Sequence, residues 1–373
     1  MKIEVKQIHS KKELEQFVKF HIELYKNNPC AVPPLMADEI KALDTAVNPA
    51  FQSAKAFYFL AMQNKKIVGR IAGIINFHET EQQHIKKLRF AYFDAIDDLK
   101  VSQALFEKLY EIAKDHGLDH LEGPMGATSM EKAGLLTEGF DQMATVIGQY
   151  NFAYYATHLE KLGFVPEKEW LEMRINAPES IPEKIYSFSD LVTKRYGLKL
   201  VRLKTKADLR KYIQPVFNLL EVSYSELESY VPITDKQKAF YAEKYANILS
   251  PDFITIIEDD AEELIAFAIV MPSFAKALQK AKGKLLPWGW YHLLKAQKKN
   301  DTAEFVLIGV HPKFQKKGVT AIIFKEMHET FKRNNIQFLE TNPELEANQS
   351  VQLLWKDYDP VIHKRRKTFR KEV

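Results

Sequence analysis

The residues best suited to chemistry lie in a basic turn between an apolar run and an amphipathic segment. The run EFVLIGV (304–310) is continuously apolar, which is typical of a buried strand. Residues 320–335 carry apolar side chains at helical spacing, with charge on the other side. The turn between them, HPKFQKKGVT, contains three lysines and Gly318. Because N–H groups at a helix N-terminus lack internal partners and carry the positive dipole end, this arrangement predicts an anion site, with phosphate as the usual occupant.

The composition is that of an ordinary globular protein. The chain has 373 residues, of which 46% are hydrophobic and 27% charged, which argues against disorder and predicts two domains. Cys30 is the single cysteine, so the sequence has no disulfide framework. The charged stretch 1–16 does not read as a signal peptide, and the longest apolar stretch, 264–271, is too short to cross a bilayer. We therefore expect a cytoplasmic protein without a membrane partner.

The two halves of the sequence show the same order of elements. Each starts with a strand and a helix, continues with a hairpin, and ends with a strand, a long helix, a strand and a final helix. The first strand of the second half, at 198–203, follows its counterpart at 2–8 by 196 residues, and so does the hairpin. A repeat of this length indicates tandem domains rather than a solenoid. The boundary is predicted in 176–185, where two prolines interrupt the pattern.

The second half resembles the GNAT superfamily of N-acetyltransferases. Members of that family have an apolar strand ending in Val-x-Pro, an aromatic residue, and a Gln/Arg-x-x-Gly-x-Gly/Ala turn that opens a helix. An asparagine then begins the helix after the next strand, as Asn348 does here. The matching residues are Val310, Pro312, Phe314, Gln315, Gly318 and Thr320. Thr320 departs from the pattern, because it adds a branched side chain where the family has Gly or Ala.

The resemblance implies an α/β fold of two tandem GNAT-like domains, each a mixed, mostly antiparallel sheet flanked by helices. We expect residues 1–177 to form a degenerate domain without a phosphate turn, and 178–197 to be a linker. Residues 198–373 are then the domain with the cofactor motif, interrupted by a basic and aromatic insertion at 273–300. The first half lacks the motif because Asp94, Asp97 and Asp98 stand at the turn, where they would repel a pyrophosphate.

The resemblance further implies that acetyl-CoA is the cofactor. Amides of the turn would hold the pyrophosphate, the strand backbone would pair with the pantetheine arm, and Asn348 would lie near its end. Lys313 adds positive charge beside the phosphates. The expected cofactor-binding residues are Ile308, Gly309, Val310, Gln315, Lys316, Lys317, Gly318, Val319, Thr320 and Asn348.

The catalytic residues are less clearly marked. Trp355 occupies the place of the tyrosine that protonates the leaving thiolate in many members, and an indole N–H cannot supply an acid proton. Tyr358 could replace it, and Glu304 or Glu340 could act as a base through water. For each of these residues an ordinary structural role is an equal alternative. No metal ligands are expected, because His116 and His120 have no third partner.

Several readings of the function stay open at this point. The leading hypothesis is N-acetylation of a small amine or a peptide amino group by a monomer or homodimer. Glu131, Glu138 and Asp141, in the loop 123–141, would suit a cationic acceptor if they face a cleft between the domains. The first alternative is a catalytically silent acyl-CoA-binding protein, which Trp355 favours.

The other alternative is a nucleic-acid-binding module, which is disfavoured. It would use the insertion 273–300, with seven lysines, two tryptophans and no acidic residue, and the basic tail 363–371. We expect instead that Trp288 and Trp290 are buried in a helical pair, and that the tail forms a last edge strand whose lysines prevent aggregation.

Overall fold

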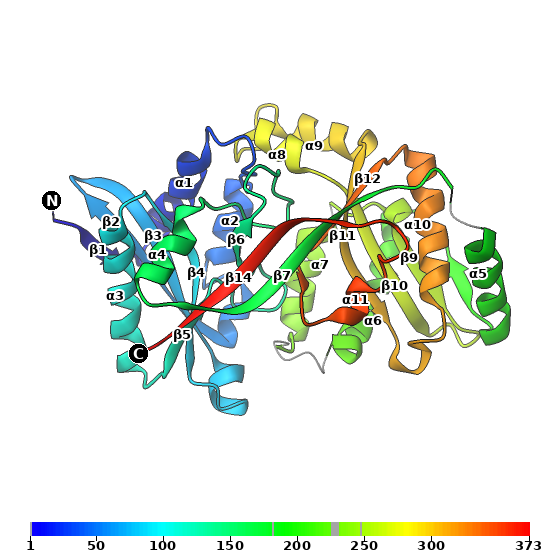
Figure 1. Ribbon diagram of the computed structural model, residues 1–373, viewed down its shortest axis with the longest axis horizontal. Coiled ribbons are helices and arrows are strands. Elements are labelled where there is room, and N and C mark those ends of the chain that lie inside the picture. The colour runs from blue at the N-terminus through cyan, green and yellow to red at the C-terminus, as the bar shows by residue number, and fades with distance from the viewer. Residues whose placement is uncertain (1, 181–182, 225–230, 247) are drawn as a thin grey trace.

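The computed structural model describes residues 2–180, 183–224, 231–246 and 248–373. Its strands join in one 14-stranded sheet that passes through both halves of the molecule, with helices packed on it (Figure 1). The order along the main path is β1-β2-β3-β4-β5-β14-β7-β12-β11-β10-β9-β8, and the remaining two strands, β6 and β13, pair with β14 and β7. Most neighbours are antiparallel, while β4 with β5 and β11 with β12 are parallel. The predicted fold class, a mixed sheet flanked by helices, is confirmed.

The first half follows the predicted order of elements. Helix α1 begins at a capping box, in which Ser10 and Glu13 satisfy each other's backbone N–H groups, and it buries Phe17 and Val18 against the sheet. The elements of this half are β1 (Glu4–Gln7), α1 (Lys11–Tyr25), α2 (Met36–Leu43), η1 (Pro49–Gln52), β2 (Ala54–Gln63), β3 (Lys66–Asn76), η2 (His78–Gln82), β4 (Lys87–Ala95), α3 (Leu99–Asp115), β5 (His120–Gly123), β6 (Leu135–Glu138), α4 (Tyr154–Lys161) and β7 (Val165–Asn176).

The second half repeats this order and adds two helices between its hairpin and the next strand. Residues 183–196, inside the expected linker, form a helix that packs on α10. The helix expected from residue 348 covers only four residues. The elements are α5 (Glu183–Tyr196), β8 (Lys199–Val201), α6 (Lys206–Tyr224), α7 (Asp235–Ala246), η3 (Pro251–Phe253), β9 (Ile254–Glu258), β10 (Leu264–Pro272), α8 (Ala275–Ala281), α9 (Gly289–Lys298), β11 (Thr302–Val310), η4 (Pro312–Phe314), α10 (Thr320–Asn334), β12 (Phe338–Thr341), β13 (Glu344–Leu345), α11 (Gln349–Gln352) and β14 (Val361–Glu372).

The last strand of each half is exchanged with the other half. Strand β7 pairs with β12 of the second half, and β14 pairs with β5 of the first half. The two strands also pair with each other along most of their length, and Figure 1 shows them crossing the middle of the molecule together. The exchange makes the two sheets continuous, so neither half has a complete sheet from its own residues.

The prediction that the basic tail is an edge strand is wrong. Strand β14 lies between β5 and β7, and its Lys364 and Arg366 are fully buried. Both cations pair with the buried carboxylate of Glu172 on β7, with 2.9 Å between Lys364 Nζ and Glu172 Oε2. Burial raises the pKa of Glu172, but the two cations outweigh it and lower the pKa to about 2. These charges therefore join strands inside the protein and are not available to nucleic acid.

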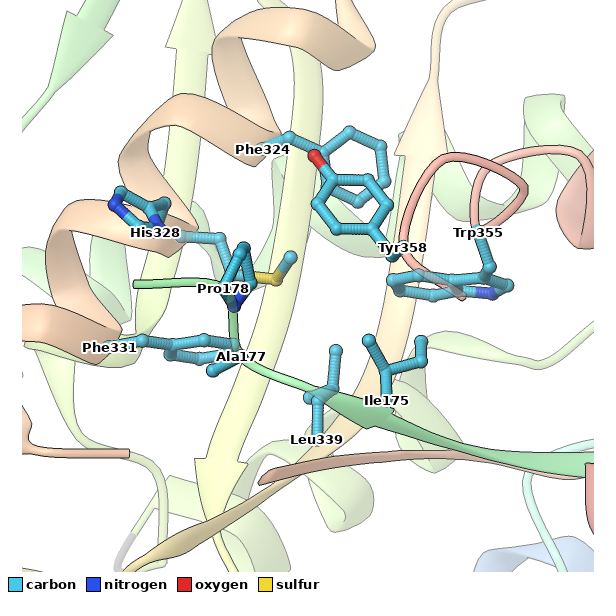
Figure 2. A pocket seen from close by; sticks show the side chains of 10 residues that line it. Ile175, Ala177, Pro178, Phe324, His328, Phe331, Leu339, Trp355 and Tyr358 are labelled. Carbon is cyan, nitrogen blue, oxygen red and sulfur yellow. The ribbon is translucent and has the colours of Figure 1, made fainter. Parts of the chain in front are cut away.

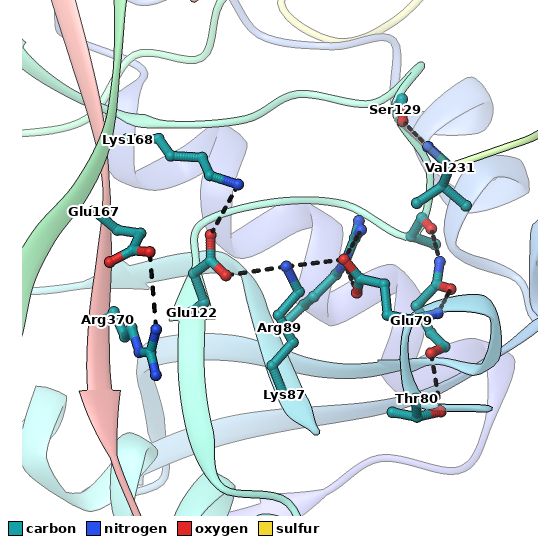
Figure 3. A network of polar contacts seen from close by, with 12 residues as sticks. Glu79, Thr80, Lys87, Arg89, Glu122, Ser129, Glu167, Lys168, Val231 and Arg370 are labelled. Carbon is teal, nitrogen blue, oxygen red and sulfur yellow. Dashed lines mark hydrogen bonds and ion pairs between the residues drawn. The ribbon is translucent and has the colours of Figure 1, made fainter. Parts of the chain in front are cut away.

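A second buried ionic network holds β4 and β5 together in the first half (Figure 3). Glu79 pairs with Arg89 at 2.7 Å and with Lys87 at 2.8 Å, and Lys87 reaches Glu122 at 3.0 Å. The same view shows a link between the halves, because the N–H of Val231 donates to Ser129 Oγ at 3.0 Å. The ion pairs thus fix the two parallel strands where they pair, at residues 87–89 and 120–122.

The expectation that Trp288 and Trp290 are buried is wrong. The insertion does form a helical pair, α8 and α9, but the two indoles are 68% and 46% exposed. Leu278 and Leu293 occupy the inner side of the pair instead. Among the described residues, no helix is both long and apolar enough to span a bilayer, and no cluster of His, Cys, Asp and Glu could hold a metal ion.

The exchange predicts that the second half cannot fold alone. In a fragment of residues 190–373, β14 loses its three neighbours β5, β6 and β7, and Lys364 and Arg366 lose Glu172. We expect no cooperative unfolding transition for this fragment by circular dichroism. A matched fragment, 165–373, restores β7 and the ion pairs and should regain part of the ordered sheet. A sharp transition of the shorter fragment near that of the full chain would contradict the prediction.

Candidate functional site

The basic turn after β11 has the geometry expected of an anion site. His311 begins the short helix η4, and its Nδ1 accepts the N–H of Lys313 at 3.2 Å. Lys316 and Gly318 have φ of 60° and 80°, which reverses the chain into α10. Lys313, Gln315, Lys316 and Lys317 are exposed, so positive charge surrounds the turn. The N-terminus of α10 follows directly.

The N-termini of α10 and its counterpart α3 differ in one decisive respect. In the part of the chain that is described, no side chain caps α10. In the first half, the carboxylate of Asp98 accepts the N–H of Lys100 and caps α3. Asp94 lies buried below that turn and pairs with Arg70 at 2.7 Å. A carboxylate therefore occupies the first helix end, while the end of α10 offers its N–H groups to an external anion.

Gly318 is required by both conformation and space. Its positive φ disfavours any side chain, and a Cβ there would lie 2.6 Å from the ring of Phe188. Phe188 belongs to α5, which covers this side of the turn. Lys317 Nζ lies 5.4 Å from the ring centre of Tyr196, also on α5. The predicted cofactor residues Val319 and Thr320 are buried and half-buried at the start of α10.

Strands β11 and β12 separate beyond Phe305 and Thr341. The last ladder contact is the N–H of Asn342, which donates to the Phe305 carbonyl at 3.1 Å. Further along β11, where the strand no longer pairs with β12, its carbonyls accept hydrogen bonds from side chains. Asn342 donates to Val306, Tyr224 Oη to Ile308 at 2.9 Å, and Ser223 Oγ to Val310 at 3.2 Å. A pantetheine arm pairing with residues 308–310 would have to replace the two donors from α6.

Glu344, on β13, is a buried carboxylate that sequence reasoning missed. It is 8% exposed, and burial raises its pKa to about 7, although the indole N–H of Trp355 donates to Oε1 at 2.8 Å and partly opposes the rise. Its Oε2 is buried and has no hydrogen-bond partner among the described residues. A carboxylate with a free oxygen and a pKa near 7 is suited to general-base chemistry. The sequence showed only an acidic residue after Pro343.

Tyr224 lies close enough to Glu344 to be affected by its charge. Burial raises the pKa of Tyr224 to about 12, and the negative charge of Glu344 adds to the effect. The phenol therefore stays protonated near neutral pH and can donate a proton. The hydroxyl of Tyr224 donates to the Ile308 carbonyl, so the phenol lies at the edge of β11 that is separated from β12. It can act there as the acid that the indole of Trp355 cannot be.

The predicted bases Glu304 and Glu340 are neighbours across β11 and β12. Glu304 is 1% exposed, and burial raises its pKa to about 7. Both of its oxygens are engaged, because Oε1 accepts from Ser273 Oγ at 2.6 Å and Oε2 from the N–H of Val146 at 3.1 Å. Glu340 lies 3.4 Å from Lys364 Nζ, beside the exchanged strands. The structure therefore places these two carboxylates side by side, next to the exchanged strand β14.

Tyr358 and Trp355 line a small apolar cavity below α10 (Figure 2). Trp355 is buried between Phe305 and Phe324, and Tyr358 lies 5.3 Å from the ring of Phe324. The cavity measures about 20 Å³, enough for little more than one water molecule, so it is a packing defect rather than a ligand site. Asn348 stands half-buried at the N-cap position of α11.

A larger cavity of about 180 Å³ lies between the two halves. Its walls come from β4, the loops 32–39 and 124–151, and helix α7. Glu131 and Lys132 line it, and burial raises the pKa of Glu131 and lowers that of Lys132. Val146 also lines it, and its N–H donates to Glu304, which links this wall of the cavity to β11. Of the three predicted loop acids, Glu138 instead lies exposed and pairs with Arg365.

The chain was compared with family models and with solved structures. No family model matches the chain. The most similar solved structures include a tandem GNAT protein from the clavulanic acid biosynthesis pathway, with a TM-score of 0.57 and 13% identity over 100% of this chain and 98% of that one. The chain has a tandem GNAT fold. The resemblance seen in the sequence is thereby confirmed at the level of fold.

Two bacterial proteins are similar in sequence. Protein YghO of Escherichia coli is 26% identical over 373 residues, covering 98% of this chain and 94% of YghO. A bacterial ceramide synthase of Caulobacter vibrioides is 28% identical over 310 residues, covering 81% of this chain and 79% of that protein.

The turn geometry predicts an anion site beside Lys316 and Lys317, and CoA is the anion with which to test it. Reversing both charges, K316E/K317E, should weaken CoA binding by about tenfold or more in calorimetric titration, because charge-assisted hydrogen bonds to phosphate are lost. Gly318→Asp should abolish binding, since a carboxylate would occupy the turn. Asp98→Asn, at the matching turn of the first half, should leave the affinity unchanged. Wild-type affinity in both second-half variants would place the cofactor elsewhere.

Proposed function

We propose that the protein is an acyl-CoA-dependent N-acyltransferase with its cofactor site in the second half. The observation that carries the proposal is the uncapped N-terminus of α10, reached through Gly318 and two lysines beside the separated strands β11 and β12. Helix ends of this kind bind phosphate, and the separated strand edge offers backbone groups to an amide-containing arm. The tandem GNAT fold supports this assignment.

The acyl group and the acceptor are proposed only as classes. The sequence pattern implies acetyl-CoA as donor and an amine as acceptor. The relative from Caulobacter vibrioides is called a ceramide synthase, and a ceramide is an N-acylated amino alcohol, so the name supports transfer to nitrogen. The name also suggests a long-chain acyl-CoA as a second acyl donor, to be compared with acetyl-CoA in one assay. A long-chain amino alcohol is likewise an acceptor to compare with small amines and peptides.

We propose Glu344 as the general base and Tyr224 as the proton donor. When bound, an acyl-CoA supplies a thioester carbonyl that the amine attacks, so that a C–N bond forms as the C–S bond breaks. The free oxygen of Glu344 takes the proton from the amine, and Tyr224 gives its phenol proton to the departing thiolate. Solvent then takes the proton from Glu344 and returns one to the Tyr224 phenolate. Glu304, Glu340 and Tyr358 stay as predicted alternatives, but hydrogen bonds engage both oxygens of Glu304.

This assignment predicts the pH dependence of the reaction. Burial raises the pKa of Glu344 to about 7, so the carboxylate forms, and the rate rises, as the pH increases through about 7. Glu344→Gln should lower kcat by about a hundredfold or more and remove that limb of the profile. Glu304→Gln is the matched control, because its pKa is also about 7. A limb that survives in E344Q and vanishes in E304Q would assign the base to Glu304.

The proton donor is tested in the same way. Tyr224→Phe should lower kcat with little change in Tm. Tyr358→Phe should keep most of the wild-type kcat, because Tyr358 packs against Phe324. A different outcome would be that CoA binds but neither acetyl-CoA nor a long-chain acyl-CoA transfers its acyl group to any amine of a broad panel. The protein would then be a silent acyl-CoA-binding protein.

We further propose that the first half supplies part of the acceptor pocket. The cavity between the halves is lined by β4 and the loops of the first half, and by α7 of the second. Small-molecule sites occur preferentially at such domain interfaces. Glu131 gives this cavity a half-buried carboxylate that an ammonium group would neutralise. A role in the acceptor pocket would explain why the first half keeps the fold although Asp98 caps the helix end at its turn.

The acceptor assignment predicts a defect in amine binding. Glu131→Gln should raise the KM for the amine by about tenfold with little change in kcat, because a charge-assisted hydrogen bond is lost. Glu138→Gln, in the same loop but exposed, should behave like the wild type. An unchanged KM in E131Q would exclude the cavity as the acceptor site.

A further inference from the structure

The insertion α8–α9 carries an apolar surface that the rest of the protein does not cover. Six of the sixteen large apolar side chains that are exposed in the described chain lie within ten residues, 285–294. They are Leu285 (43% exposed), Leu286 (75%), Trp288 (68%), Trp290 (46%), Tyr291 (50%) and Leu294 (48%). We call these six residues the apolar ridge. Scattered apolar residues are normal on a surface, whereas a contiguous group indicates an interaction site.

Lysines surround the apolar ridge, and nothing in the segment balances them. Residues 273–300 contain seven lysines and no acidic residue. Lys276 pairs with Asp301 at 3.9 Å, but the other six form no ion pair with any described residue. They are Lys280, Lys282, Lys284, Lys295, Lys298 and Lys299, and all are exposed. The surface thus combines uncovered apolar groups with uncompensated positive charge.

The helical pair that bears the ridge is firmly attached to the body. Gln279 Nε2 donates to the carbonyls of Pro29 and Ala31 at 2.7 and 2.9 Å, and the N–H of Met36 donates to Gly283 at 2.9 Å. Figure 1 shows α8 and α9 at the outer margin of the molecule, next to the first half. A ridge held in this way is a fixed feature of the surface rather than a loose segment.

We propose that the apolar ridge docks the protein on an anionic lipid bilayer. Tryptophan and tyrosine favour the boundary between acyl chains and headgroups, because one end of the ring system is apolar and the other polar. Leucines enter the apolar layer, and lysines bind anionic headgroups while their stems lie along apolar surface. The binding is peripheral, and it revises the expectation of no membrane partner. It is independent of the proposed catalytic chemistry.

The proposed surface also borders the interdomain cavity. Leu278 of α8 and the loop 32–35, to which α8 is attached, both line that cavity. Docking through the ridge would therefore bring the bilayer to the side of the protein where the cavity lies. If the cavity is the acceptor pocket, as proposed above, a lipid-soluble amine would have a short way from the bilayer into it.

Co-sedimentation of the full chain with vesicles tests the docking. We expect binding to phosphatidylcholine vesicles that contain phosphatidylglycerol, much weaker binding to pure phosphatidylcholine, and a loss of binding as salt rises. The variant L286A/W288A should lower the partition coefficient by about tenfold or more, because both side chains leave the apolar layer. The matched control V165A/L191A removes two side chains that are each 58% exposed but lie elsewhere, and it should bind like the wild type.

The charge contribution is tested separately. The variant K295Q/K298Q/K299Q should weaken binding by about fivefold for each lysine and reduce the salt dependence. Three exposed lysines on other elements, in K100Q/K114Q/K161Q, form the control and should matter little. Only variants whose Tm equals that of the wild type are compared, and none of the substitutions is at a residue proposed for catalysis.

Three results would overturn the proposal. The first is an absence of binding to vesicles with phosphatidylglycerol. The second is equal binding by the wild type, the ridge variant L286A/W288A and the lysine variant K295Q/K298Q/K299Q. The third is a dimer in light scattering that L286A/W288A converts to monomer while vesicles bind neither form, because the ridge would then be covered by a second copy of the chain.

Discussion

The buried carboxylate of Glu172, held between Lys364 and Arg366, is the interaction on which the rest of the structure depends. All three side chains are at most 1% exposed, and they join β7 of the first half to β14 of the second. Removing one member of such a group costs about 3–5 kcal/mol, because an unpaired charge is left in the interior. Since the partners come from opposite halves, the charges are satisfied only when both last strands have exchanged. The exchange thus couples the folding of the two halves.

This coupling also fixes the cavity between the halves. Val146, in the wall of the cavity, donates its N–H to Glu304 on β11, and Lys364 lies beside Glu340 on β12. The loops of the first half are therefore held against the strands that separate in the second. The first half thereby forms one wall of the cavity that lies between the halves. Its sheet also gains the strand, β14, that covers its open edge.

The two strand-to-helix turns show how one fold can satisfy a helix N-terminus from within the chain or leave it uncapped. Asp98 satisfies the end of α3 from within the chain, while Gly318 and the adjacent lysines leave the end of α10 to an external group. The position of Trp355 is a similar case. Its indole does not replace a tyrosine as an acid, but its N–H holds Glu344, a carboxylate whose other oxygen stays free. Tyr224, from α6, then provides the phenol at the edge of β11.

The sequence by itself determined what depends on neighbouring residues. Periodicity gave the order of elements in both halves, and Gly318 with its lysines identified the turn, because φ and local charge are set within a few positions. Tertiary structure decided what depends on distant partners. The basic tail reads as an edge strand until β5 and β7 are known to flank it, and Trp288 reads as buried until the inner side of its helical pair is known. Likewise, the burial that raises the pKa of Glu344 and leaves one oxygen free comes from Trp355 and the surrounding core, which no local pattern records.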